Sequence, residues 1–195
     1  RLGYVLFYNL EFYLNNFFDI IKIWQGGMSF HGGLLGIIIA SIFYSKKNND
    51  NVFEYLDVVA LVSPIGIFFG RIANFINSEL YGHETTMSWG VQFIKIDNLY
   101  RHPSQIYEAI LEGIILFLLL TFFWNKDKFK TPGKLSSLFL ILYSTFRFIV
   151  EYARVPDEQL GYLILNLTMG QLISFVFFLI GFLLYYFIND TKKKL

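Results

Sequence analysis

Long apolar stretches separated by short polar ones run through the whole chain. A helix needs about 20 mostly apolar residues to cross the hydrocarbon core of a bilayer. Five stretches approach or meet this length and predict membrane-spanning helices, at residues 27–45, 55–76, 106–124, 135–153 and 170–188. We therefore expect an all-α, polytopic membrane protein with five complete transmembrane helices and a short segment on its outer face.

The beginning of the chain predicts part of a further helix. Arg1 opens the apolar stretch RLGYVLFYN, which is too short to cross a bilayer. We interpret residues 1–9 as the end of a membrane helix whose start lies upstream. On this interpretation residues 1–195 form one integral-membrane domain, a fragment that lacks the first helix and most of the second.

Composition supports a bilayer environment and excludes several other classes. Apolar residues make up 55% of the chain and charged residues 16%, against about 45–50% and about 25% in soluble domains. A net charge of +1 argues against a nucleic-acid partner. The chain has no Cys, which excludes disulfides, a Cys-based zinc site and a Cys nucleophile. Its three His show no metal-ligand spacing, so we expect no metal and no cofactor.

Lys and Arg are segregated along the chain. The segments 46–47, 126–134 and 192–194 carry nine of the eleven Lys, and alternating spans place all three on one side. The positive-inside rule makes that side the cytoplasm. All five Arg lie at the opposite helix ends or in the opposite connections: Arg1, Arg71, Arg101, Arg147 and Arg154. Topology alone would remove both residue types from the outer side, so the outer Arg indicate a function.

The outer helix ends carry the candidate chemistry. GGMSFHGG (26–33) opens one span, GRIANFINSELYG (70–82) closes the next, and RHPSQIYE (101–108) opens the third. On the fourth span, helical spacing places Tyr143, Arg147, Glu151 and Arg154 on one face. Arg, carboxylates, His and Asn should therefore converge at one membrane face.

Charges inside a membrane are costly, roughly 2.5–3.5 kcal/mol for an Arg at a span centre. Arg147 and Glu151 lie one turn apart and can pair. Arg71 has no carboxylate one turn away in its own helix, so it needs a partner from elsewhere or an anionic ligand. Guanidinium suits a phosphate because it donates to two oxygens at once, and a helix N-terminus also favours anions. The pattern predicts a site for a lipid phosphate.

Structural interpretations compete with these. The pairs Gly32/Gly36 and Gly66/Gly70 fit helix packing. His31 can be a capping or packing residue, and His102 with Pro103 and Ser104 can be turn chemistry that starts a helix. Glu108 and Glu112 share a face and can be buried partners of Arg on neighbouring helices rather than catalysts. Asp57 fits an interfacial position near the cytoplasmic end.

GGMSFHGG, GRIANFINSELYG, HPSQIYE and RFIVEYARVPD resemble, in order and spacing, the signature segments of the prolipoprotein diacylglyceryl transferases. The opening RLGYVLFYN and the closing MGQ also resemble that family, so the resemblance covers nearly the whole chain. It implies transfer of the diacylglyceryl group of phosphatidylglycerol to the lipobox Cys thiol of a preprolipoprotein signal peptide. A thioether forms and glycerol phosphate leaves, as the first step of bacterial lipoprotein maturation. The implied location is the bacterial inner membrane, with the site toward the periplasm.

The resemblance also implies roles for individual residues. The catalytic set would be His31 (the expected base), Arg71, Glu79, Arg147 and Glu151. The groups that bind substrate would be Arg71, Asn74, Gly82, His102, Tyr143, Arg147 and Arg154. Glu79 and Glu151 are alternative bases if burial raises their pKa. A functional Tyr on the first helix of the family lies outside this sequence.

Two other classes compete with a transferase. A small transporter or channel would explain the spans, but transport sites usually lie near the midplane between repeats. The polar residues here lie toward one face. A non-catalytic assembly subunit would explain the spans but not Arg71.

Overall fold

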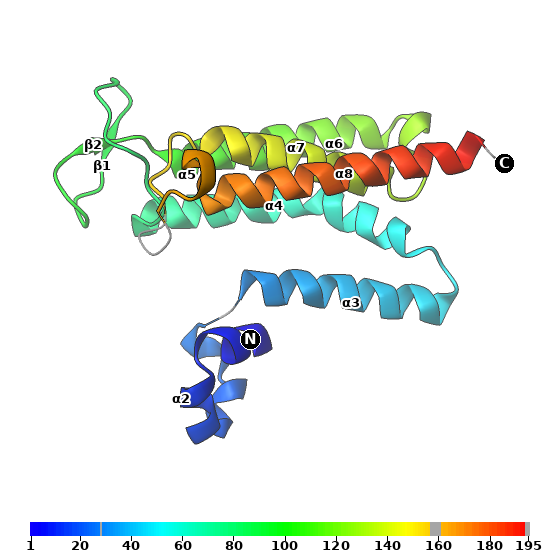
Figure 1. Ribbon diagram of the computed structural model, residues 1–195, viewed down its shortest axis with the longest axis horizontal. Coiled ribbons are helices and arrows are strands. Elements are labelled where there is room, and N and C mark those ends of the chain that lie inside the picture. Colours follow the sequence, from blue (N-terminus) through cyan, green and yellow to red (C-terminus); the bar gives the residue numbers. More distant parts are fainter. Residues whose placement is uncertain (28, 157–160, 194–195) are drawn as a thin grey trace. The chain divides into compact units, whose positions relative to one another are not determined.

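The computed structural model describes residues 1–27, 29–156 and 161–193, and these are mostly helical (Figure 1). The chain divides into two compact units, Arg1–Leu56 and Asp57–Leu195.

The first unit consists of short helices followed by one long helix. The short elements are α1 (Leu2–Tyr8), α2 (Leu10–Asn15) and the 3-10 turns η1 (Phe17–Ile21) and η2 (Ile23–Gln25). The long helix is α3 (Phe30–Asn48), whose N-cap Ser29 accepts a hydrogen bond from the Gly32 amide. A Cβ on Gly32 would lie 3.4 Å from the Gly3 Cα, so α1 and α3 cross closely here. This contact supports the predicted packing role for Gly32. A Cβ on Gly36, Gly66 or Gly70 would meet nothing within 4 Å among the described residues, so the structure gives no such support for the rest of the two predicted pairs.

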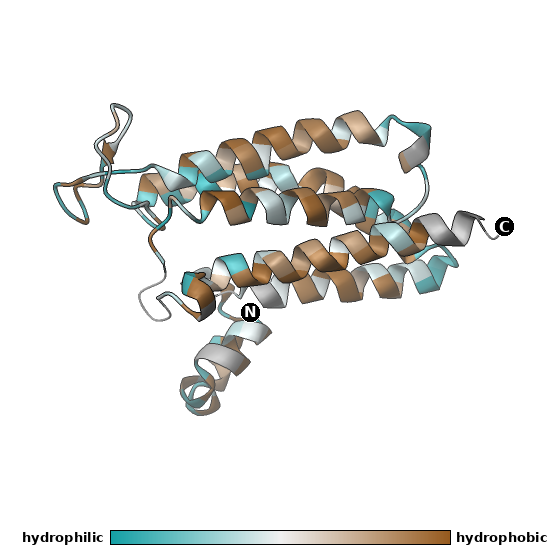
Figure 2. Cartoon of the chain, turned by 45° about the horizontal axis from the view of Figure 1, so that its top comes forward, coloured by the Kyte–Doolittle hydropathy of each residue, from teal (hydrophilic) through white to brown (hydrophobic). Residues whose placement is uncertain are grey.

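Helix α4 (Val52–Asn77) leads into the second unit. There α5 (Ser104–Glu108), η3 (Ala109–Ile115) and α6 (Leu116–Trp124) follow one another without a break, and η3 is a π-helix. The 3-10 turn η4 (Asp127–Phe129) leads to α7 (Lys134–Val150), and the turn η5 (Ile164–Asn166) leads to α8 (Met169–Lys193). Figure 2 shows hydrophobic colouring along these helices and polar colouring at many of their connections.

Three helices are long and apolar enough to cross a membrane: Val52–Asn77, Ser104–Trp124 and Met169–Ile188. They correspond to the second, third and fifth predicted spans. Within the described residues, α3 and α7 do not meet this combination of length and hydropathy, and α7 has only 17 residues. The helical membrane protein is therefore supported, whereas the count of five complete spans plus a truncated one is not confirmed.

The core of the second unit lies between α4, α6 and α7. Leu116, Leu120 and Leu135 are fully buried there, and Leu61, Phe123 and Tyr143 are among the side chains packed against them. This core holds the three helices against one another.

Asp57 connects the beginning of α4 to the beginning of α7. Its Oδ2 accepts from the Gly133 amide at 2.8 Å, and its Oδ1 accepts from the Ser136 amide at 2.7 Å. Asp57 thus caps the start of α7, satisfying N–H groups that have no partner within the helix. Its side chain is buried, because the carboxylate faces the N-terminus of a neighbouring helix. The predicted depth of Asp57 near the membrane interface stays a prediction.

Residues 78–103 form a head segment between α4 and α5. It contains a two-stranded antiparallel sheet, β1 (Val91–Gln92) and β2 (Tyr100–Arg101), which extends beyond the helix ends in Figure 1. Phe93 is buried against Phe75 and Tyr81. The sequence predicted only a polar segment here, because strands this short leave no periodic pattern.

Candidate active site

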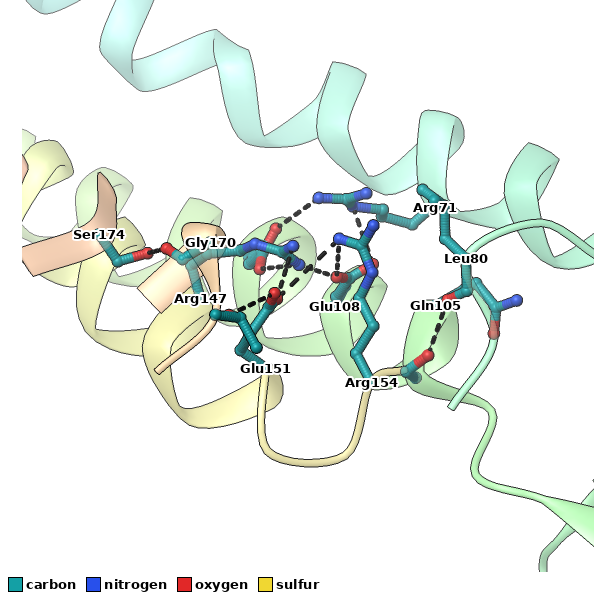
Figure 3. Close-up of polar contacts among 12 residues, drawn as sticks. Arg71, Leu80, Gln105, Glu108, Arg147, Glu151, Arg154, Gly170 and Ser174 are labelled. Atoms are coloured by element: carbon teal, nitrogen blue, oxygen red, sulfur yellow. Dashed lines mark hydrogen bonds and ion pairs between the residues drawn. The ribbon is translucent and has the colours of Figure 1, made fainter. Parts of the chain in front are cut away.

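Three arginines and three glutamates meet near the head end of the second unit (Figure 3). Arg71 comes from α4, Glu108 from α5 and Glu112 from η3, while Arg147 comes from α7. Glu151 and Arg154 follow directly after α7. We call these six residues the arginine–glutamate cluster.

Glu108 lies at the centre of this cluster and is fully buried. Its Oε2 lies 3.2 Å from Arg71 Nε, and its Oε1 pairs with Arg147 Nη1. Arg154 Nη1 lies 3.9 Å from the same Oε1. One carboxylate therefore contacts arginines from three different parts of the chain.

Glu112 supports the arginines from one turn further along. Its Oε2 accepts from Arg71 Nη2 at 3.3 Å, and its Oε1 lies 3.9 Å from Arg147 Nη1. Glu112 is fully buried and belongs to the π-helical η3; such local widenings of a helix often occur at functional sites. Glu108 and Glu112 are thus buried partners of Arg on neighbouring helices, as the first of the two interpretations held.

Glu151 is fixed by two neighbours besides the cluster. Arg147 Nη2 lies 2.7 Å from its Oε2, which confirms the predicted pair one turn apart. The Thr168 hydroxyl donates to its Oε1 at 2.9 Å. A Cβ on Gly170 would lie 2.5 Å from that same oxygen, so only glycine leaves room for the carboxylate.

Thr168 also begins the last helix. Its amide donates to Gln171 Oε1 at 3.0 Å, and the Gln171 amide donates to the Thr168 hydroxyl at 3.2 Å. This is the reciprocal arrangement of a capping box. The spacing T-x-x-Q is visible in the sequence, so this positioning residue had a signal that was overlooked.

Arg154 departs from the predicted helical face. Helix α7 ends at Val150, and Arg154 instead forms an isolated antiparallel bridge with Gly82 of the head segment. It still reaches the cluster, with Nη1 3.9 Å from Glu151 Oε2. A Cβ on Gly82 would lie 2.5 Å from two carbonyl oxygens, those of Ala153 and His102, so glycine permits this crossing.

Asn74 and Glu79 form a second polar group beside the cluster. The Asn74 amide donates to Glu79 Oε2 at 2.9 Å. Gln105 is fully buried and donates to the Glu79 carbonyl at 2.5 Å. Ser104 donates to the Leu80 carbonyl at 2.9 Å. Ser104 therefore tethers the head segment to α5 rather than capping the helix, and neither it nor Gln105 was predicted in this role.

The remaining predicted residues have different settings. His102 Nδ1 lies 3.0 Å from the Tyr107 hydroxyl, and the Trp89 indole N–H donates to the same hydroxyl at 2.8 Å. Tyr143 stacks on Phe139 in α7. His31 belongs to α3 of the first unit, and its side chain lies outside the described part of the structure.

Formal charges in the cluster balance, with three cations against three anions. Removing one member of such a buried pair typically costs about 3–5 kcal/mol, because an uncompensated charge remains. Arg71 is the most exposed of the three arginines, at 17% of its side chain. Its Nη1 makes no hydrogen bond or ion pair with any residue that the structure describes, so this edge of the guanidinium is open to another acceptor.

A sequence profile described as prolipoprotein diacylglyceryl transferase matches residues 1–187. The chain belongs to this family. It is 48% identical, over all of its length and 74% of the relative, to the phosphatidylglycerol–prolipoprotein diacylglyceryl transferase of Ehrlichia canis (strain Jake). It is 49% identical to the enzyme of that name from Rickettsia bellii (strain OSU 85-389), over 93% of this chain and 69% of the relative. For Wolbachia pipientis subsp. Culex pipiens (strain wPip) the identity is 48%, over 95% and 71%. Family membership favours the transferase interpretation over a transporter or an assembly subunit.

Proposed function

We propose that this chain transfers the diacylglyceryl group of phosphatidylglycerol to the lipobox Cys thiol of a prolipoprotein. The observation that carries the proposal is the arginine–glutamate cluster at one end of the helices, in a member of this family. In the reaction the thiol sulfur attacks a glycerol carbon, and the bond from that carbon to the phosphate oxygen breaks. The thiol proton passes to a base, and glycerol phosphate leaves.

The departing phosphate needs cations where its negative charge develops. Arg71 fits this role because its Nη1 is open and its side chain is partly exposed. Arg147 and Arg154 are more buried, and their positions are set by Glu108 and Glu151. The glutamates hold the guanidinium groups in place before substrate binds. The N–H donors therefore need little reorganisation during the reaction.

His31 is the base in this proposal, as the family resemblance implies. A Cys thiol has a pKa near 8.5 and a neutral His near 6.5, so proton transfer is uphill by roughly 2.7 kcal/mol. Nearby arginines offset this difference by stabilising the thiolate. Glu151 is less suitable, since Arg147 and Thr168 already occupy its oxygens.

We further propose that residues of both units belong to one membrane domain with five spans and the end of a sixth. The three Lys-rich segments would face the cytoplasm of a bacterial inner membrane, and the arginine–glutamate cluster would face the periplasm. The family match, which extends over both units, supports a single domain.

The proposal is tested with protein that includes any sequence adjoining residues 1–195, purified and placed in vesicles of phosphatidylglycerol with a peptide that contains a lipobox Cys. Mass spectrometry should detect the peptide with an added diacylglyceryl group. Arg147→Ala should lower the rate about 100- to 1,000-fold, as loss of a comparable donor does. Arg147→Lys should also lose most activity, because a compact ammonium does not reproduce the planar set of donors by which Arg147 contacts Glu108 and Glu151.

Lys130→Ala is the matched control, since Lys130 is an exposed cation in the connection between α6 and α7. It should leave the rate unchanged. Absence of adduct with the unaltered protein would refute the proposed function. Normal turnover of Arg147→Lys would show that a point charge is sufficient.

A further inference from the structure

The head segment exposes several large apolar side chains outside the predicted spans. They are Met87, Trp89, Ile94, Ile96, Leu99 and Tyr100. Ile94 is the most exposed of them, at 81%. Exposed apolar side chains that gather on one short segment indicate a site of interaction with a partner or a membrane.

Ile94, Ile96, Leu99 and Tyr100 belong to the antiparallel hairpin formed by β1, β2 and the turn between them. Phe93 is buried against Phe75 and Tyr81, and the next residue, the exposed Ile94, begins the turn between β1 and β2. The turn is closed by an ion pair of 2.7 Å between Arg101 and Asp97. Arg101 holds the pKa of the Asp97 carboxyl below its usual value. The apolar tip is therefore presented by a fixed hairpin, residues 91–101, which we call the head hairpin.

The neighbouring helices set the depth of the head segment. It joins the ends of two helices long and apolar enough to span a membrane, Val52–Asn77 and Ser104–Trp124. Trp89 donates its indole N–H to Tyr107, which lies in the first turn of the second of these helices. The Trp89 ring thus lies at the level where a span begins. Trp and Tyr collect at that level because they have an apolar ring and a polar tip.

We propose that the head hairpin inserts its tip into the headgroup region of the bilayer. Ile94 and Ile96 would reach the boundary of the acyl chains, while Lys95 between them extends its ammonium to lipid phosphates. A bilayer is favoured over a protein partner because Tyr107 fixes Trp89 at the membrane surface. The proposed partner of the head hairpin is therefore a lipid surface. This contact is separate from the role proposed for the arginine–glutamate cluster.

Tryptophan fluorescence tests this directly. The chain has three Trp, so Trp24→Phe combined with Trp124→Phe leaves Trp89 as the sole indole. In phosphatidylglycerol/phosphatidylcholine vesicles, lipids with a spin label near the headgroup should quench Trp89 strongly. Lipids labelled near the end of the acyl chain should quench it weakly.

The tip itself is tested with a fluorophore, because a chain without Cys takes one label at one introduced thiol. A nitrobenzoxadiazole label on Ile94→Cys should be quenched several-fold more by the shallow lipid label than the same fluorophore on Asp127→Cys. Asp127 is the matched control, at 92% exposure in the connection after α6. Equal, weak quenching at the two positions would overturn the proposal. Quenching of Trp89 without quenching of the label at position 94 would also overturn the proposal. The hydrogen bond of Trp89 to Tyr107 of α5 would then be enough to explain why Trp89 lies near the lipid.

Discussion

At the scale of single residues, the burial of charge in the arginine–glutamate cluster depends on Glu108. This one carboxylate contacts Arg71, Arg147 and Arg154, and its side chain has no exposed area. Sequence spacing predicts the pair of Arg147 with Glu151, because both lie on one helix. The pairing of Arg71 with Glu108 could not be assigned, since it joins two helices whose rotation about their axes depends on packing.

Glu108→Gln should therefore destabilise the protein strongly. The amide keeps the size of the side chain but removes the negative charge from among three arginines, two of them buried. We therefore expect a loss of about 3–5 kcal/mol in the free energy of unfolding. Denaturant unfolding in detergent, followed by helical circular dichroism, measures it. Glu84→Gln, an exposed carboxylate of the head segment, should change stability little. Equal stabilities of the two variants would show that Glu108 does not balance the cluster.

His31→Gln should slow lipidation more at neutral pH than at pH 9. Above the thiol pKa of about 8.5 the substrate supplies its own thiolate, so a base contributes less. The rate of adduct formation, compared between variant and unaltered protein at both pH values, provides the ratio. The same defect at both would indicate that His31 positions substrate or supports packing.

At the scale of elements, apolar patterning predicts where helices lie but not what joins them. The third and fifth predicted spans coincide with Ser104–Trp124 and with α8. The π-helical turn η3 and the hydrogen bonds of Asp57 have no sequence period. Both involve residues far apart in the sequence: Asp57 bonds to Gly133 and Ser136, and Gly113 of η3 lies close against Phe68.

Asp57→Ala tests the contact between α4 and the start of α7. The variant leaves two amides at the start of α7 without their acceptor, and loss of a cap typically costs about 0.5–2 kcal/mol. Burial of these amides places the effect toward the upper end. Asp57→Asn should be intermediate, because its amide retains one acceptor oxygen. Thermal unfolding in detergent compares both with Glu54→Ala, an exposed carboxylate on the same helix. A midpoint for Asp57→Ala equal to that of Glu54→Ala would contradict the capping role.

At the scale of the whole molecule, the distribution of Lys and Arg makes a prediction that helix length alone does not. Helix α7 has 17 residues, or about 26 Å of helix, slightly less than a hydrocarbon core of about 30 Å. The turn through residues 151–153 extends it, and its Arg side chains are balanced within the cluster. That α7 crosses the membrane therefore remains a prediction. It rests on the distribution of Lys and Arg on either side of the helix as much as on the hydropathy of the helix.

Labelling of single introduced Cys residues decides the topology, because the chain itself contains none. Thr86→Cys lies in the head segment and Lys130→Cys in the connection between α6 and α7, on either side of the helix Ser104–Trp124. Pro156→Cys and Lys130→Cys lie on either side of α7. A maleimide that cannot cross membranes should label positions 86 and 156 in cells with a permeabilised outer membrane, and position 130 only after lysis. Labelling of 130 together with 156 in unlysed cells would show that α7 does not cross. Arg147 would then lie outside the membrane. Its contacts with three buried glutamates could then not be explained by the cost of a charge inside the bilayer.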